Sequence, residues 1–143
     1  MTFQPTVDRL QTATLSVSAT TGGSSNVLTL TGRRQTPAAL TLTDGLTDLS
    51  MVPVGQTVSA SYLLQNTGQT ATDIAVAVMV ADSFVLGAGT TCGTTLAGGA
   101  SCQILVDFTP LAAATYSTTL TVTSAGAVAP PPITVMGTGI VAP

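Results

Sequence analysis

The chain has 143 residues, of which 45% are hydrophobic and only 6% are charged, and its formal net charge is −3. It contains no His, Lys, Glu or Trp, so most side chains that enzymes use as general bases, Schiff-base amines or metal ligands are absent. We therefore expect no enzymatic activity, no cofactor and no metal. Three arginines cannot form the basic clusters that phosphate binding requires, so we also expect no nucleic-acid partner.

The length and hydropathy pattern favour one domain of ordinary size with a remainder. No stretch approaches the roughly 20 consecutive apolar residues of a membrane helix, so we expect no membrane insertion. The segment Met1–Pro5 has neither the basic region nor the apolar region of a secretion signal. Export of the parent protein would therefore depend on a signal that is not present in this chain.

One segment of the chain occurs twice. Residues Phe3–Gly32 align without a gap with Phe108–Gly137, 105 positions further on. The identical pairs are Phe3/Phe108, Pro5/Pro110, Thr14/Thr119, Leu15/Leu120, Val17/Val122, Thr29/Thr134 and Gly32/Gly137. A period of about 100 residues is typical of tandem β-sandwich domains. We predict a complete sandwich unit at residues 37–143, preceded at residues 1–36 by the closing strand pair of a truncated repeat.

In the first segment, strands are predicted at about Thr12–Ala19 and Val27–Thr31. They carry an apolar row that an isolated hairpin cannot bury, because two strands alone are marginally stable in water. The row consists of Ala13, Leu15, Val17, Leu28 and Leu30. One hypothesis is that the missing strands lie upstream in a longer array. The other is that Leu15, Val17, Leu28 and Leu30 belong to assembly strands that dock on another copy or on the complete unit by strand addition.

Apolar residues alternate with small or polar ones through the complete unit, which predicts strands. Short opening strands surround an Asp44-Gly45 turn, and a longer strand ends at Asn66-Thr67-Gly68. We expect Asn66 and Gly68 to form a turn because both residue types tolerate positive φ. Asp44 and Asp48 are the only candidates for a calcium site, but the segment lacks the carboxylate density of a known calcium loop.

Later in the chain, three more alternating rows are expected to face the core. Their inward residues are Cys102, Ile104, Val106 and Phe108, then Tyr116, Thr118, Leu120 and Val122, and finally Ile133 and Val135. Pro110 is expected to end or bend its strand and to plug one end of the core. At Gly137, either a side chain does not fit or φ is positive. Six or seven short strands without helical periodicity predict an all-β, antiparallel sandwich.

Cys92 and Cys102 flank a Gly-rich segment that is typical of a loop or hairpin turn. We predict a structural disulfide between them; two buried free thiols are the alternative. Without His the pair makes a poor zinc site, and its spacing is not that of a C-x-x-C redox catalyst. A disulfide indicates an oxidising compartment, so we expect an extracellular, cell-surface or periplasmic protein.

These features together resemble a known family. The stretches Val54–Gly68, Cys92–Pro110 and Val135–Gly139 are similar to the abnormal-spindle/Hydin type of immunoglobulin-like domain, a sandwich of the major-sperm-protein-like kind. The resemblance covers about residues 37–143, whereas residues 1–36 resemble only the closing strands. Bacteria carry such domains in tandem in large exported proteins. The resemblance implies an immunoglobulin-like fold with scaffold, adhesion or spacer roles, and it implies no catalytic residues.

We therefore expect a non-enzymatic structural or adhesive module of an exported tandem-repeat protein, with other immunoglobulin-like repeats or copies of itself as partners. Self-assembly by β-strand addition is one way in which such a module would associate. The alternative is a module that binds a surface glycan or protein through sandwich loops such as Asp82–Thr91. In that loop Phe84 is the sole aromatic residue, and it is either a sugar-stacking ring or a core residue.

Overall fold

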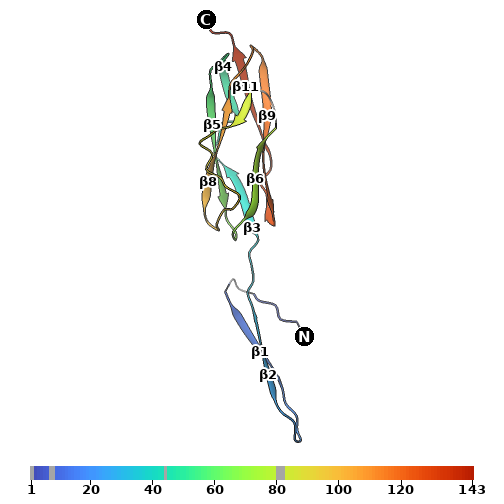
Figure 1. Cartoon of the computed structure of the whole chain (residues 1–143). Helices are drawn as coiled ribbons and strands as arrows, with labels where there is room; N and C mark the ends of the chain where they lie inside the picture. Colours follow the sequence, from blue (N-terminus) through green and yellow to red (C-terminus); the bar gives the residue numbers. More distant parts are fainter. Residues whose placement is uncertain (1, 7–8, 44, 80–82) are drawn as a thin grey trace. The chain divides into compact units, whose positions relative to one another are not determined.

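The computed structural model describes residues 2–6, 9–43, 45–79 and 83–143. Within these ranges the regular elements are eleven β-strands, and no helix is long and apolar enough to span a membrane. The chain divides into two compact units, Met1–Thr36 and Pro37–Pro143, which we call the hairpin unit and the sandwich unit (Figure 1). The prediction of an all-β protein is confirmed.

The hairpin unit contains β1 (Gln11–Val17) and β2 (Asn26–Gly32), which pair antiparallel. Their register places Ala13 opposite Leu30 and Leu15 opposite Leu28. Because side chains alternate between the faces of a strand, these apolar residues share one face of the two-stranded sheet with Val17. That face is poorly covered, since Val17 is 61% exposed and Leu28 is 57% exposed.

The sandwich unit consists of two sheets. The five-stranded sheet has the order β10-β3-β5-β8-β7, and the four-stranded sheet has the order β4-β11-β9-β6. The strand bounds are β3 (Ala38–Thr43), β4 (Asp48–Pro53), β5 (Val58–Asn66), β6 (Thr72–Val78), β7 (Phe84–Leu86), β8 (Ser101–Phe108), β9 (Thr115–Ala125), β10 (Ala127–Val128) and β11 (Ile133–Ile140). Two pairs, β10 with β3 and β4 with β11, are parallel, and the remaining pairs in the two sheets are antiparallel.

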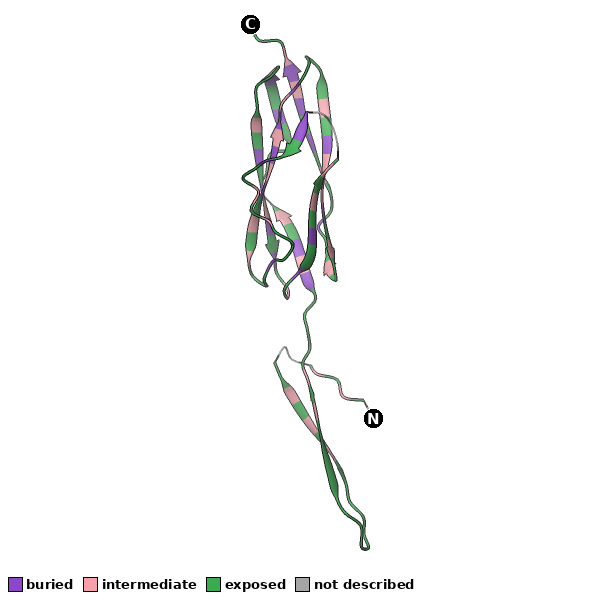
Figure 2. Cartoon of the chain, viewed as in Figure 1, coloured by how far each residue is buried: buried purple, intermediate pink, exposed green. Residues whose placement is uncertain are grey.

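The core lies between the two sheets and follows the alternation of the sequence (Figure 2). Its fully buried members from the long central strands are Tyr62, Leu64, Ile104, Val106, Phe108, Leu120 and Val135. The outward positions of β9 are mostly Thr and Ser, which favour strands and still accept water. The core is therefore built from branched aliphatic side chains around a small number of aromatic rings.

The segment that the sequence predicted as the loop Asp82–Thr91 contains a strand. Among its described residues, β7 pairs antiparallel with β8, and Phe84 lies opposite Phe108. Phe84 is 3% exposed, and its ring stacks on that of Phe108 with the centroids 4.5 Å apart. Of the two interpretations of this aromatic residue, the structure shows the core residue.

Phe108 and Pro110 lie in the core at one end of the sandwich, where β8 ends and β11 passes close by. A Cβ atom on Gly137 would overlap the Phe108 ring, and φ at Gly137 is not positive. Glycine is needed at this position because the ring and the backbone of β11 approach each other closely. Phe108 also contacts Tyr116 edge-on, with ring centroids 5.7 Å apart.

The chain enters the sandwich unit at one end and leaves it at the other (Figure 1). Strand β3 begins beside the last residues of β5, because Leu40 pairs with Asn66. Strand β11 ends beside the loop that leads into β5, since the amide of Val54 donates to the carbonyl of Ile140 at 2.9 Å. The first strand, β3, thus begins at one end of the sandwich, and the last strand, β11, ends at the opposite end.

The burial of Tyr62 predicts how the free energy of unfolding changes at alkaline pH. Its side chain is 1% exposed and its hydroxyl donates to the carbonyl of Leu46 at 2.7 Å. Burial raises the pKa of Tyr62 above its usual 10.0. The folded state therefore favours the protonated phenol, and this contribution to stability is complete below pH 10.0 and is lost as the pH rises towards the folded-state pKa.

We expect urea denaturation followed by circular dichroism to give a stability that changes little between about pH 6 and 9, because the chain has no His, the side chain that ordinarily titrates in this range. Above that range the free energy of unfolding should fall. Tyr62→Phe should cost about 1 kcal/mol at neutral pH through the lost hydrogen bond, and it should flatten the alkaline decline. An equally steep decline in the variant would show that another group is responsible.

Candidate functional site

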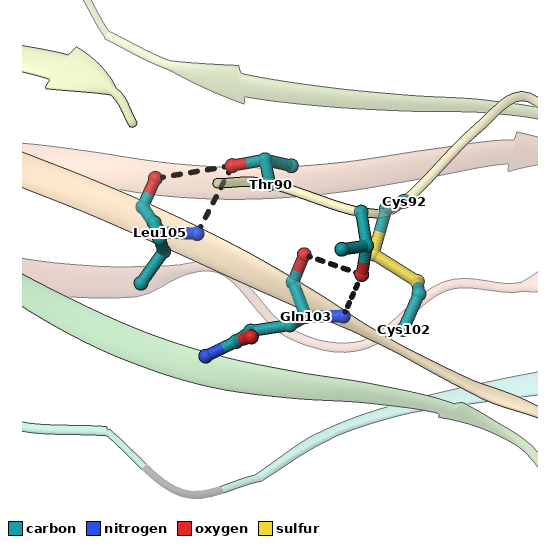
Figure 3. The surroundings of a disulfide bond; sticks show 6 residues. Thr90, Cys92, Cys102, Gln103 and Leu105 are labelled. Carbon is teal, nitrogen blue, oxygen red and sulfur yellow. Dashed lines mark hydrogen bonds between the residues drawn. A yellow bond between two sulfur atoms is a disulfide. The ribbon is translucent and has the colours of Figure 1, made fainter. Parts of the chain in front are cut away.

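Strand β7 pairs with only the last residues of β8, and the preceding part of the same edge is covered by the segment Thr90–Cys92, which is not itself a strand (Figure 3). The amide of Thr91 donates to the carbonyl of Gln103 at 2.8 Å, and the amide of Gln103 donates back to the hydroxyl of Thr91 at 2.8 Å. The amide of Leu105 donates to the hydroxyl of Thr90 at 3.0 Å. Threonine hydroxyls therefore accept hydrogen bonds that the carbonyls of a neighbouring strand would otherwise accept.

The disulfide between Cys92 and Cys102 lies directly beside these hydrogen bonds (Figure 3). Its two Cα atoms are 5.0 Å apart, and the described chain contains no free cysteine. The bond fixes the segment that follows Thr91 against the start of β8. We refer to Thr90, Thr91 and the disulfide as the edge clip.

Three of the four edge strands of the sandwich sheets, β4, β10 and β6, carry a feature that disfavours addition of another strand. At β4, Ser50 has a φ of 57° and Pro53 has no amide hydrogen to donate. Strand β10 has two residues and is followed closely by Pro130–Pro132. At β6, Asp73 has a φ of 52° where the register with β9 shifts, and the amide of Ile74 donates to the carbonyl of Thr94.

Asn66 connects three segments at the end of the sandwich where the chain enters. Its side chain is completely buried, and its Oδ1 accepts from the amides of Gly68 at 3.0 Å and Ala39 at 3.3 Å. Its Nδ2 donates to the carbonyls of Leu96 at 2.9 Å and of Gln69. All four hydrogen-bonding positions of the amide group are thus occupied.

The prediction that the Asn66-Thr67-Gly68 turn depends on positive φ is wrong. Neither Asn66 nor Gly68 has a positive φ. Asn66 instead acts through its side chain, as described above. Gly68 is required because a Cβ there would overlap the backbone of Pro37 and Ala38. Its small size lets the turn pack directly against the start of β3.

The remaining candidates do not form a reactive site. Asp44 lies outside the described residues, and the Oδ1 of Asp48 accepts a hydrogen bond from the amide of Ser50 at 2.8 Å. The described residues contain no group of three potential metal ligands. Arg33 and Arg34 are exposed in the segment between β2 and β3. Leu15, Val17, Leu28 and Leu30 lie together on the apolar face of the hairpin unit.

Sequence reasoning missed the two threonines of the edge clip and the partner of Asn66, Leu96. Thr90 and Thr91 fall in a predicted loop, and no periodic pattern marks a residue whose hydroxyl replaces a backbone acceptor. Their position immediately before Cys92 is the one available signal, because a disulfide holds its neighbours close to the strand of its partner. Leu96 is 7% exposed and lies within the loop that the disulfide closes.

The disulfide predicts a measurable loss of stability on its removal. Replacing both cysteines, as Cys92→Ser with Cys102→Ser, should lower the free energy of unfolding by about 2 to 3 kcal/mol, because a short closed loop is released in the unfolded chain. Thermal and urea unfolding of the two proteins measures this loss. Hydrogen exchange at Gln103 and Leu105 should become faster than at the central strand β5. Unchanged exchange at both positions would show that the threonines hold the edge without the disulfide.

Replacing Asn66 should destabilise the protein more than replacing its exposed neighbour Gln65. Asn66→Ala leaves two amides and two carbonyls without their buried partner, so it should cost about 3 kcal/mol or more in urea denaturation. Gln65→Ala is the matched control: Gln65 is the preceding residue of β5, its side chain is exposed, and its loss should cost less than about 0.5 kcal/mol. Equal costs for the two variants would contradict the role of Asn66.

Comparison with known proteins adds to this geometry. No curated protein sequence matches the chain significantly. Among solved structures, the ASH/PapD-like domain 7 of human CEP192 has a TM-score of 0.58 at 12% identity, with 73% of this chain and 87% of that chain covered. The Vibrio cholerae VesB protease has a TM-score of 0.47 at 22% identity, with 70% of this chain and 31% of that chain covered.

Domains 4 and 5 of the S-layer protein SbsC have a TM-score of 0.44 at 17% identity, with 92% of this chain and 58% of that chain covered. The likeness to the CEP192 domain shows a shared PapD-like, immunoglobulin-like fold. Residues 38–138 match the family described as HYDIN/CFA65/VesB-like, Ig-like domain. The chain therefore belongs to the HYDIN/CFA65/VesB-like family of Ig-like domains, and the family resemblance seen in its sequence is confirmed.

Proposed function

We propose that this chain is a non-enzymatic structural module that acts as a spacer or scaffold in an exported tandem-repeat protein. Ig-like domains of this family are generally non-catalytic structural modules. The observation that carries the proposal is the path of the chain, which enters the sandwich unit at β3 and leaves it at β11 on the opposite side (Figure 1). A module with this path adds length to an array.

The length that one unit adds follows from its longest central strand. Strand β5 has nine residues, and at about 3.3 Å per residue it spans roughly 27 Å. Leu40, near the start of β3, pairs with one end of β5, and Val58 at the other end of β5 pairs with Phe108, close to β11. A sandwich unit therefore separates its neighbours by at least this distance.

The same path determines how the unit bears load. Tension along an array would pull β3 and β11 in opposite directions, and these strands belong to different sheets. In each sheet the inter-strand hydrogen bonds run across the strands. A pull along the strands loads many such bonds at the same time, whereas a pull across one end breaks them in succession. The fold supports resistance to end-to-end tension.

The compartment is part of the proposal. A disulfide persists in oxidising surroundings such as the cell surface, the medium or the periplasm. Other Ig-like repeats are the partners that a spacer in an array requires. The glycan-binding alternative has weaker support, because Phe84 is buried and does not offer a ring for stacking on a sugar.

Single-molecule pulling of the full chain tests the spacer function. Handles attached at Pro37 and Pro143 load the strands lengthwise, and we expect a high unfolding force. Handles at Pro37 and Gly126 are the matched control, because Ala127 pairs with Ala38 and both handles then lie at the same end of the sandwich. The second geometry peels strands apart and should unfold at a several-fold lower force.

Reduction of the disulfide provides an internal scale for the same experiment. The two cysteines are 10 positions apart and their Cα atoms are 5.0 Å apart when bridged. At roughly 3.5 Å per residue the extended loop spans about 35 Å, so reduction should add about 30 Å to the released length. Equal unfolding forces in the two pulling geometries would contradict a load-bearing spacer. A lower unfolding force in the lengthwise geometry than in the peeling geometry would contradict it more strongly.

A further inference from the structure

The hairpin unit has the same strand register as the last antiparallel pair of the sandwich unit. In the hairpin, Gln11 pairs with Gly32 and Leu15 pairs with Leu28. In the sandwich, Tyr116 pairs with Gly137 and Leu120 pairs with Ile133, and every one of these residues lies 105 positions after its counterpart. Strands β1 and β2 are therefore equivalent to β9 and β11 in pairing as well as in sequence.

Two local contacts are similar as well. A Cβ on Gly32 would lie 3.1 Å from the Phe3 ring, and Gly137 approaches the Phe108 ring in the same way. The amide of Thr6 donates to the Oε1 of Gln11 at 2.7 Å, and the amide of Ala112 donates to the hydroxyl of Tyr116 at 3.0 Å. The two acceptors occupy corresponding positions, whereas the donors are offset by one residue, because Thr6 corresponds to Leu111. At the position where the sandwich uses a tyrosine hydroxyl, the hairpin uses a glutamine amide for the same purpose.

The two strand pairs differ in what covers them (Figure 2). Leu120 is 0% exposed and Val122 is 4% exposed, because they face the opposite sheet of the sandwich. Of their counterparts, Leu15 is half-buried and Val17 is 61% exposed. The hairpin therefore presents the apolar face of a sandwich sheet without the sheet that normally packs on it.

The sandwich unit shows what such a face packs against. Leu120, Val122 and Val135 belong to the same core cluster as residues of β5 and β8. Strands β6 and β4 flank β9 and β11 on their outer edges. In the described part of the hairpin unit, β1 and β2 pair only with each other, so both outer edges are open. A complete partner for this hairpin must supply a covering sheet and two edge strands.

We infer that the apolar face of the hairpin, formed by Leu15, Val17, Leu28 and Leu30, binds the opening strands of another unit of the same kind, the segment equivalent to β3–β8. This inference deepens the proposed function by naming the partner that joins one unit of an array to the next. A second hairpin is a poorer fit, because it would cover the face but leave the outer edges of β1 and β2 unpaired.

An extended chain tests the inference. A second copy of residues 38–107 is fused to the amino side of residue 3 in the otherwise unchanged chain, so that Asp107 precedes Phe3 as it precedes Phe108 in the native sequence. The added strands should fold with β1 and β2 into a second sandwich. We expect a second disulfide by thiol counting and at least 100-fold slower hydrogen exchange of the β1 and β2 amides than in the unextended chain. Unchanged exchange would overturn the inference.

Adjacent residues on opposite faces of β2 provide the matched control. Leu28→Asp in the extended chain should restore fast exchange in β1 and β2, because Leu28 corresponds to Ile133 at the core. Val27→Asp should retain slow exchange, because Val27 corresponds to Pro132, which is exposed. Both residues are exposed in the hairpin, at 57% for Leu28 and 66% for Val27. Equal effects of the two substitutions would overturn the inference.

The unextended chain supplies a second measurement. Sedimentation over a range of concentrations should show a monomer whose β1 and β2 amides exchange fast while those of β5 exchange slowly. A dimer that Leu28→Asp abolishes would identify a second copy as the occupant and overturn the inference. The pulling experiment on the sandwich unit does not involve this face, so a failure of the spacer function and a failure of this inference are distinguishable.

Discussion

The edges of the two sheets must be closed without the charged side chains that usually protect them. The chain has three basic and six acidic residues, and no lysine. An unpaired strand edge offers donors and acceptors to any other strand, and lysine is a common way of blocking that addition. The sandwich unit uses uncharged side chains and backbone geometry instead: threonine hydroxyls and a disulfide along β8, a positive φ in β4 and in β6, and prolines after β10. These features do not depend on ionic strength, because none of them is an ion pair.

The hairpin unit contains the same kind of strand, and its described residues show none of this protection at the outer edges of β1 and β2. Two of its apolar residues correspond to positions that the sandwich buries completely, since Leu15 corresponds to Leu120 and Leu30 to Val135, both of which are 0% exposed. Open edges and an uncovered apolar face therefore occur together in one short segment. Association with a neighbouring unit is expected to be concentrated there rather than on the sandwich, where three of the four edge strands are protected. This distribution of uncovered and protected strand edges fits a spacer that joins its neighbour through one segment.

The sequence predicted the features that arise from alternation and missed those that arise from contact between distant segments. The inward rows of β5, β8 and β9 are regular, so their residues can be identified from periodicity alone. Strand β7 has three residues, which is too short for a periodic signal, and Phe84 is buried because Phe108 lies opposite it. Residue type assigns Asn66 to a turn, but its role depends on Ala39 and Leu96, which lie 27 and 30 positions away. Such roles are determined by tertiary packing, which a single sequence does not display.

The duplication within the chain separates two contributions to the fold. The hairpin keeps the register of β9 and β11 without a covering sheet, and the close approach of Phe3 to Gly32 is kept with it. Burial of the apolar row, by contrast, requires strands that precede it in the order of a unit. A two-stranded sheet is marginal by itself in water, so the register alone does not make a stable module. The closing strands of a unit thus keep their pairing register without the opening strands, whereas the burial of their apolar row depends on the opening strands.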